Sequence, residues 1–292
     1  MTLSDDQFDR FQKLIYDSSG IRLESRKRSL LMSRLNRRLR VAEVSGVEDY
    51  LSLIDSPRGR SEFRQLIDAV TTNETSFFRT EEHFRWFNRE FLFRVMREEQ
   101  MGHRLPELSI WSAACSVGAE PYTMAMCLQS RMAVFKHWDI QILGTDISQD
   151  AIRQAKQGIF SGRMLQGVSA TDRKRYFRQV STVPVRFQLN SAIKEQAEFH
   201  THNLLHPMLG SSFDCVFLRN VLIYFDAESK KRVLQNVASA VGRGGYLVVG
   251  PSEGVYGMMD GFQKIDSCIY RKLDPSTETP AAGSDSGVIR NE

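Results

Sequence analysis

Short apolar segments rich in β-branched residues recur through residues 81–272, and segments with helical periodicity separate them. The clearest are LSIW at 108–111, IQILGTD at 140–146, FDCVFL at 213–218 and GYLVVG at 245–250. Apolar strands joined through helices are typical of a parallel sheet that is covered on both faces. The sequence therefore predicts an α/β domain with a doubly wound, Rossmann-like sheet over residues 81–273.

The rest of the chain departs from this alternation in three places. Residues 1–80 show only helical periodicity, beginning with a capping box of Ser4 and Gln7, and predict an all-helical domain. Residues 178–196 predict a small β-rich insertion, and the two apolar segments after residue 244 predict an antiparallel edge pair. Residues 274–292 are rich in Ser, Thr, Pro and Gly and predict a disordered tail.

Several classes of protein are disfavoured by composition. No run of about 18 apolar residues exists, so no membrane span is expected, and the acidic start does not resemble a signal peptide. The four cysteines form no C-x-x-C pair, which favours free thiols in a reducing cytoplasm. Three histidines between residues 200 and 206 lack a completing ligand, so no metal site is expected.

The loop after the first predicted strand, Ala113 to Gly118, consists of small residues but lacks the G-x-G-x-x-G pattern. Small residues allow the backbone to approach a ligand closely. Glu120 at the start of the next helix would repel a phosphate and would suit an ammonium or sulfonium group. The alternative is that Glu120 only complements the helix dipole.

Asp146 ends the second predicted strand, where dinucleotide-binding folds place the acid that accepts from ribose hydroxyls. The alternative is that Asp146 caps the following helix, although Ser148 competes for that role. Two acids around a loop without a phosphate cradle indicate S-adenosylmethionine, which has a ribose and a sulfonium but no phosphate.

Five segments become specific when they are taken together: TTNETSFFR, WSAACSVGAEPYTMAM, LGTDIS, HNLL and RNVLIYF. In this order and spacing they resemble the CheR-type chemotaxis receptor methyltransferase family, over about residues 1–272. The resemblance implies an S-adenosylmethionine-dependent methyltransferase sheet with an N-terminal helical domain. It also implies methyl transfer to glutamate side chains on the cytoplasmic helices of chemoreceptors, with S-adenosylhomocysteine as the other product.

The resemblance assigns roles to particular residues. Arg79 and Tyr224 are expected to contact the target carboxylate, Glu120 the methionine amino group, and Asp146 the ribose. Asn203 and Leu204 are expected near the adenine. The full set expected at the cofactor is Asn73, Thr75, Arg79, Glu120, Asp146, Asn203, Leu204, Asn220 and Val221.

Positive charge is concentrated in residues 21–40, which carry eight basic side chains against Glu24. By the resemblance, this segment would dock on acidic receptor helices. Alternatively, it is a solvated helix face whose arginine stems cover apolar surface. The residues expected to dock are Arg26, Lys27, Arg28, Arg34, Arg37 and Arg38.

The sequence also departs from the family pattern. Leu218 stands where a cysteine is frequent, Pro251 where a histidine is frequent, and the insertion is short and lacks glycine. Family members that bind a receptor-tail pentapeptide tend to have a longer, glycine-bearing loop in the insertion, so we expect this enzyme not to depend on such a peptide. We also expect a monomer. A small-molecule or RNA methyltransferase is the runner-up, disfavoured by the missing N/D-P-P-Y/F motif, and nucleic acid is not expected as a partner. A cofactor-binding scaffold without turnover is the non-enzymatic alternative.

Overall fold

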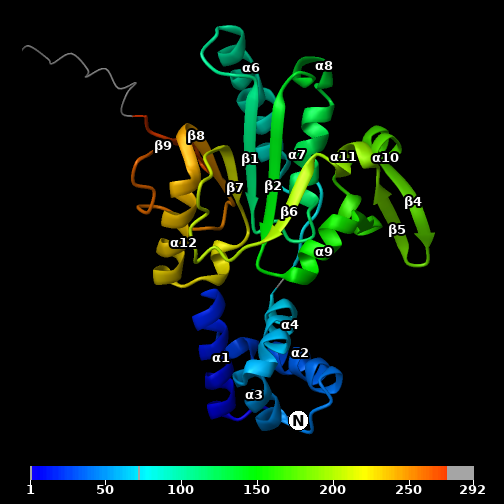
Figure 1. The fold of residues 1–292 in the computed structure, drawn as a ribbon, viewed down its shortest axis with the longest axis vertical. Coiled ribbons are helices and arrows are strands. Elements are labelled where there is room, and N and C mark those ends of the chain that lie inside the picture. The colour runs from blue at the N-terminus through cyan, green and yellow to red at the C-terminus, as the bar shows by residue number, and fades with distance from the viewer. Residues whose placement is uncertain (1, 72, 275–292) are drawn as a thin grey trace, which may run out of the picture.

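The computed structural model describes residues 2–71 and 73–274, and it stacks a small helical part against the end of a larger sheet part (Figure 1). The helical part contains α1 (Asp5–Ser19), α2 (Arg28–Val41), α3 (Val47–Asp55) and α4 (Arg60–Val70). The predicted capping box of Ser4 and Gln7 is confirmed, and Gly20 ends α1 in the left-handed conformation with φ 72°. Phe11, Ile15 and Leu35 are fully buried between these helices.

The sheet part confirms the predicted doubly wound architecture. Its sheet, within the described residues, has seven strands in the order β6-β2-β1-β7-β8-β10-β9. The strands are β1 (Glu107–Ala113), β2 (Asp139–Asp146), β6 (Ala197–Thr201), β7 (Phe213–Leu218), β8 (Val241–Val249), β9 (Phe262–Asp266) and β10 (Ile269–Lys272). The first five are parallel, and β10 runs antiparallel to β8, as predicted for the chain end. The last apolar segment is a hairpin of β9 and β10 rather than one strand.

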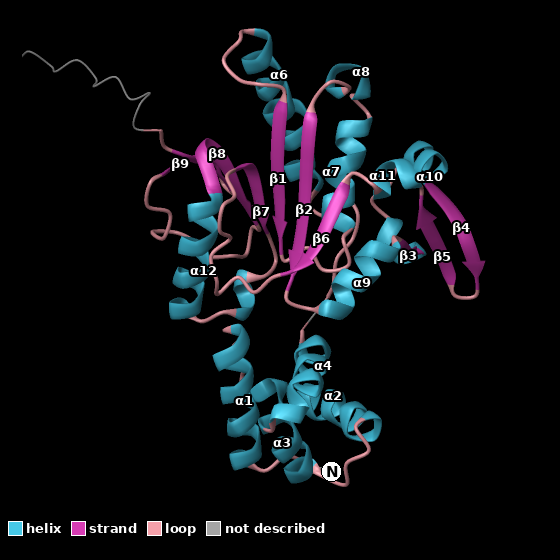
Figure 2. Cartoon of the chain, viewed as in Figure 1, coloured by secondary structure: helices cyan, strands magenta, loops and turns pink. Residues whose placement is uncertain are grey.

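Helices cover both faces of this sheet (Figure 2). Along β1, Leu108 and Ile110 join one apolar core, whereas Trp111 and Ala113 join another on the opposite face. This alternation explains why the strands read as continuous apolar runs. The helices are α5 (Glu81–Trp86), α6 (Leu92–Gln100), α7 (Ala119–Gln129), α8 (Met132–Phe135), α9 (Gln149–Gln157) and α12 (Ala227–Ala240), with a π turn at Phe87–Phe91 between α5 and α6.

The β-rich insertion lies between α9 and β6. It contains β3 (Ile159–Ser161), α10 (Ala170–Tyr176), β4 (Phe177–Thr182), β5 (Val185–Leu189) and α11 (Ser191–Lys194). Its strands form an antiparallel sheet in the order β3-β5-β4. The sequence did not reveal β3, because three residues are too few for a period-two pattern.

Two further sequence expectations concern the chain outside this core. The predicted tail at 274–292 lies, from residue 275 onward, outside the described residues. Among the described helices, none is long and apolar enough to cross a membrane.

Candidate active site

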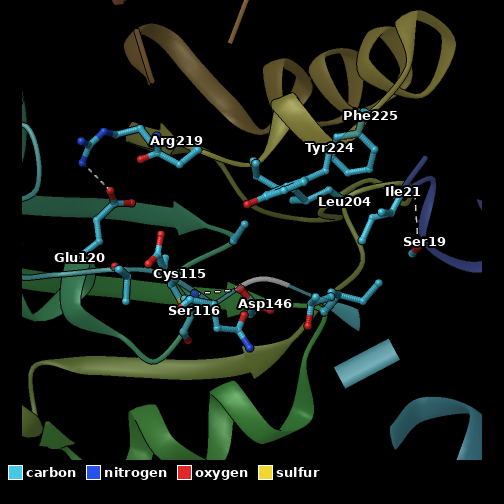
Figure 3. Close-up of a pocket in the computed structure, with 18 of the residues that line it drawn as sticks. Ser19, Ile21, Cys115, Ser116, Glu120, Asp146, Leu204, Arg219, Tyr224 and Phe225 are labelled. Atoms are coloured by element: carbon cyan, nitrogen blue, oxygen red, sulfur yellow. Dashed lines mark hydrogen bonds and ion pairs between the residues drawn. The ribbon is translucent and has the colours of Figure 1, made fainter. Parts of the chain in front are cut away.

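The helical part meets the sheet part at the carboxyl ends of the parallel strands (Figure 1). A pocket opens there (Figure 3). Ligand sites of open α/β sheets lie at this edge. All ten residues that were expected at the cofactor or the target carboxylate line this one pocket. They are Asn73, Thr75, Arg79, Glu120, Asp146, Asn203, Leu204, Asn220, Val221 and Tyr224.

Asp146 braces the loop that follows β1. Its Oδ2 accepts from the Ser116 amide at 2.8 Å, and its Oδ1 accepts from the Ser148 amide at 2.9 Å. Burial raises the pKa of Asp146, and the amide donors of Ser148 and Ser116 act in the opposite direction. Ser148, not Asp146, is the N-cap of α9, since its hydroxyl accepts from the Ala151 amide.

The loop itself has an unusual backbone. Ala114 and Ser116 have φ angles of 63° and 53°, and Gly118 follows at 88°. The left-handed conformation is unfavourable for residues with a side chain, so it is held by the bonds to Asp146 and by the bond from the Cys115 amide to the Thr145 carbonyl. Burial raises the pKa of the Cys115 thiol well above its usual value, so this thiol is neutral and is a poor nucleophile.

Glu120 is part of a buried ion pair that sequence reasoning missed. Its Oε2 accepts from Nη1 of Arg219 at 2.8 Å, and its Oε1 accepts from the Ser112 hydroxyl at 2.8 Å (Figure 3). The Arg219 side chain is only 2% exposed. The available signal was a charged residue directly after an apolar strand, but the segment RNVLIYF yielded predictions only for Asn220, Val221 and Tyr224.

Arg79 lies in a tightly constrained segment. Its neighbours Phe78 and Thr80 have φ angles of 55° and 58°. The Arg79 side chain donates from Nη1 to the Glu74 carbonyl at 2.7 Å, and its own carbonyl accepts from Nη2 of Arg219 at 2.6 Å. The loop is therefore tied to the ion pair on the sheet.

The turn after β7 is held by a buried acid. Asn220 has a φ of 59°, and the Val221 amide donates to Oε1 of Glu253 at 3.2 Å. Glu253 is fully buried, which raises the pKa of its carboxyl group. Pro251, which stands near this acid where the family frequently has a histidine, therefore leaves the contact between Glu253 and Val221 in place.

The helical part supplies pocket walls that the sequence did not indicate. The amide of Arg22 donates to the Tyr224 carbonyl at 3.0 Å, and Nζ of Lys27 lies 5.3 Å from the centroid of the Tyr224 ring. Asn203 donates from Nδ2 to the Ser18 carbonyl at 2.7 Å. The contributing residues are Ser19, Ile21, Leu23, Lys27, Leu30, Val70 and Thr71.

Arg38, one of the docking residues predicted in and before α2, is paired inside the helical part. Arg38 forms a two-point bond with Glu62, which also accepts from the Tyr50 hydroxyl, and the Arg38 side chain is only 14% exposed. This guanidinium holds α2 to α4 and has little exposed surface, so the docking role of Arg38 stays a prediction that its internal pairing does not favour. Its distant partner is invisible in a local sequence pattern.

The other docking candidates differ in their availability. Arg26 pairs with Glu24, and Arg28 pairs with Asp5. Arg34 and Arg37 are exposed and have no partner among the described residues. Of the arginines predicted to dock, Arg34 and Arg37 are therefore the two whose charge no ion pair among the described residues engages.

His83 gives the stability of the protein a pH dependence that can be measured. Burial, together with the nearby positive charge of Arg219, lowers the pKa of His83 to about 4. The unfolded chain therefore binds a proton that the folded chain refuses, and stability is lost as the pH falls from about 6.5 to about 4. We expect His83→Gln to remove roughly 3 kcal/mol of this pH-dependent loss, measured by urea unfolding at several pH values. The exposed His103→Gln variant is the control, and an identical pH slope in both variants would contradict the assignment.

Among the described residues, no group of three or more His, Cys, Asp or Glu side chains is placed to hold a metal ion. All four cysteines lie within the described residues, and all are free and buried.

Comparisons with known proteins agree with this geometry. Residues 73–271 match a family model described as CheR methyltransferase, SAM binding domain, and residues 6–71 match CheR methyltransferase, all-alpha domain. The chain is 34% identical over 281 residues to chemotaxis protein methyltransferase 1 of Pseudomonas aeruginosa, covering 93% of this chain and 99% of the relative. It is 36% identical over 247 residues to a probable chemotaxis protein methyltransferase of Rhizobium etli, covering 84% of this chain and 91% of the relative.

Similarity to solved structures is lower. The N-methyltransferase NodS from Bradyrhizobium japonicum, in complex with S-adenosylhomocysteine, has 14% identity and a TM-score of 0.35, over 64% of this chain and 88% of that one. The two family models span both parts of the chain, and the relatives match along most of their length. The chain therefore belongs to the CheR methyltransferase family and is an S-adenosylmethionine-dependent protein methyltransferase of the chemotaxis, glutamate O-methyltransferase type.

Proposed function

We propose that this enzyme methylates glutamate side chains on the cytoplasmic helices of chemoreceptors, and that it acts in the cytoplasm as a monomer. The observation that carries the proposal is the convergence of the ten predicted residues on one pocket. The pocket encloses about 1230 Å³, its open mouth included.

The acids of the pocket suit S-adenosylmethionine. Each Asp146 oxygen accepts one backbone N–H, which leaves lone pairs free for two ribose hydroxyls. Glu120 retains acceptor capacity toward an ammonium group, although Arg219 offsets much of its charge. Asn203 and Leu204 are proposed beside the adenine, and Asn220 and Val221 along the opposite wall. When bound, the cofactor supplies an electrophilic methyl group on a positive sulfur.

The protein has little proton chemistry to perform on the target. A glutamate has an ordinary pKa of about 4.3, so near neutral pH it is already an ionised nucleophile and needs no general base. Arg79 is proposed to orient this carboxylate by a two-point bond, and the Tyr224 hydroxyl to contact it. Ile21, Leu23 and Phe225 give the pocket apolar walls, which favour removal of water from the carboxylate.

Mass spectrometry of receptor fragments, after incubation with the enzyme and labelled cofactor, tests the proposal. A mass gain of one methyl group on glutamates, labile to mild base as esters are, is expected. RNA and small-molecule acceptors are tested in parallel. Labelling of RNA but not of receptor fragments would overturn the proposal, and S-adenosylmethionine binding without product in a single turnover would favour the scaffold alternative.

The exposed arginines of α2 are proposed to recognise the acidic receptor helices. Reversing both charges in Arg34→Glu/Arg37→Glu is expected to raise KM for a receptor fragment by roughly 10-fold at low salt, with less effect at high salt. The kcat and the affinity for S-adenosylhomocysteine should change little. Arg97 in α6 and Arg89 in the π turn before it are exposed, and α6 lies at the end of the molecule opposite α2 (Figure 1). Arg89→Glu/Arg97→Glu therefore makes the same charge change as a control, and an equal rise in KM there would contradict docking through α2.

The insertion supports independence from a receptor-tail peptide. Only Val183 and Pro184 connect β4 to β5, so the hairpin offers little loop to enclose a peptide. Calorimetry with a tail pentapeptide is expected to show no binding, and receptors with and without the tail should be methylated with equal kcat/KM. Micromolar or tighter binding of the pentapeptide would show that this expectation is wrong.

A further inference from the structure

The insertion sheet packs directly against the segment that carries Arg79. Phe77 is 1% exposed, and its ring meets Phe160 of β3 and Phe177 of β4 edge to face, with centroids 4.8 and 5.1 Å apart. The Phe77 amide also donates to the Met164 carbonyl at 3.0 Å. The insertion thus contacts both the side chain and the backbone of a residue two positions before Arg79.

A glycine of the insertion makes this contact unusually close. A Cβ atom at Gly167 would lie 2.5 Å from the Phe77 carbonyl oxygen and 3.4 Å from Cβ of Phe78. The first distance is shorter than real Cβ contacts, and the atom it meets belongs to the backbone, which cannot rotate away as a flexible side chain does. Any larger residue at position 167 must therefore displace the segment or the insertion loop.

The segment also has a conformation that its own residues disfavour. Phe78 and the β-branched Thr80 both have left-handed backbones on either side of Arg79. Such conformations persist when the surroundings determine them. Here the Phe78 amide donates to the Thr123 hydroxyl of α7 at 3.3 Å, the Arg79 carbonyl accepts from Arg219, and Phe77 is held by the insertion.

We propose that the insertion positions Arg79 for catalysis, and that Gly167 and Phe77 are the positioning residues through which it acts. The proposal rests on the proposed role of Arg79 in orienting the target carboxylate. It gives the insertion a part in the reaction itself, because a displacement of about 1 Å in an orienting group is enough to slow catalysis by up to roughly 100-fold.

Gly167→Ala tests this role, with Gly162→Ala as the matched control in the same loop. At Gly162 a Cβ atom would meet nothing closer than 3.4 Å. We expect Gly167→Ala to lower kcat for receptor methylation by roughly 10-fold or more. The concentration of active sites used for kcat is determined by S-adenosylhomocysteine binding. The Kd for S-adenosylhomocysteine and KM for the receptor should stay within about threefold, and Gly162→Ala should keep kcat within about twofold.

Phe177→Leu is the second variant, which decides the matter if Gly167→Ala does not fold. Phe177 belongs to the insertion, and this variant removes its edge-to-face contact with Phe77. It is expected to lower kcat while the Kd for S-adenosylhomocysteine stays unchanged. Unchanged kcat per active site in the folded variants would overturn the proposal, and so would a parallel loss of kcat and S-adenosylhomocysteine binding, which indicates general disruption.

Arg79→Ala separates the two levels of the argument. If this variant methylates receptors as the parent does, the proposed role of Arg79 fails, and positioning by the insertion fails with it. If Arg79→Ala is inactive but Gly167→Ala and Phe177→Leu are fully active, only the positioning role is overturned.

Discussion

Arg219→Ala is expected to lower the free energy of unfolding by about 3–5 kcal/mol and to weaken binding of S-adenosylhomocysteine severely. Arg219 and Glu120 form an ion pair in which the side chains are 2% and 13% exposed. Removing the guanidinium leaves the Glu120 carboxylate buried without its partner, and it also removes the donor to the Arg79 carbonyl. Urea unfolding and calorimetry measure the two effects.

Two further variants separate charge burial from site geometry. The double variant Glu120→Gln/Arg219→Met replaces the ion pair with less polar groups and should recover much of the stability, but not the affinity. Arg104 pairs with Asp214 near the amino ends of β1 and β7, and its side chain is 19% exposed. Arg104→Ala therefore removes a comparable ion-pair partner away from the pocket. It should leave S-adenosylhomocysteine binding unchanged. An Arg219→Ala protein with parental stability and affinity would refute the importance of the pair.

Asp146→Ala is expected to raise the Kd for S-adenosylhomocysteine by roughly 10- to 100-fold while the protein remains folded. Hydrogen bonds to a charged group contribute about 1.5–3 kcal/mol, and the proposed ribose contact depends on this carboxylate. The variant also leaves the Ser116 and Ser148 amides without their acceptor, so a loss of about 1–3 kcal/mol in stability accompanies the change.

Asp68→Ala is the control for that structural loss. Asp68 accepts from the Gln149 amide at 3.0 Å at the start of α9, so its removal also deprives a half-buried amide of an acceptor. We expect a comparable loss of stability with little change in S-adenosylhomocysteine affinity. Equal affinity in Asp146→Ala and the parent would sink the ribose assignment.

Much of the site was predictable because parallel strands end at the same edge of the sheet. Asp146 follows one strand, the Ala113–Gly118 loop another and Asn220 a third, so topology alone brings them together. Arg219 was missed because its importance depends on Glu120, which is 99 positions away and meets it only when β1 and β7 pair. The internal pairing of Arg38 was missed for the same reason, since Glu62 lies on another helix.

The sequence by itself determined the alternation of strands and helices, the helical start of the chain, the loop without a phosphate cradle and the acids beside it. These follow from periodicity and from residues near one another in the chain. Only the tertiary structure decided which charges are paired, which arginines of α2 remain free, and that Ile21 and Leu23 wall the pocket. It also decided that Gly167 lies close against the Phe77 carbonyl. Burial and contact depend on distances between residues that are far apart in the chain.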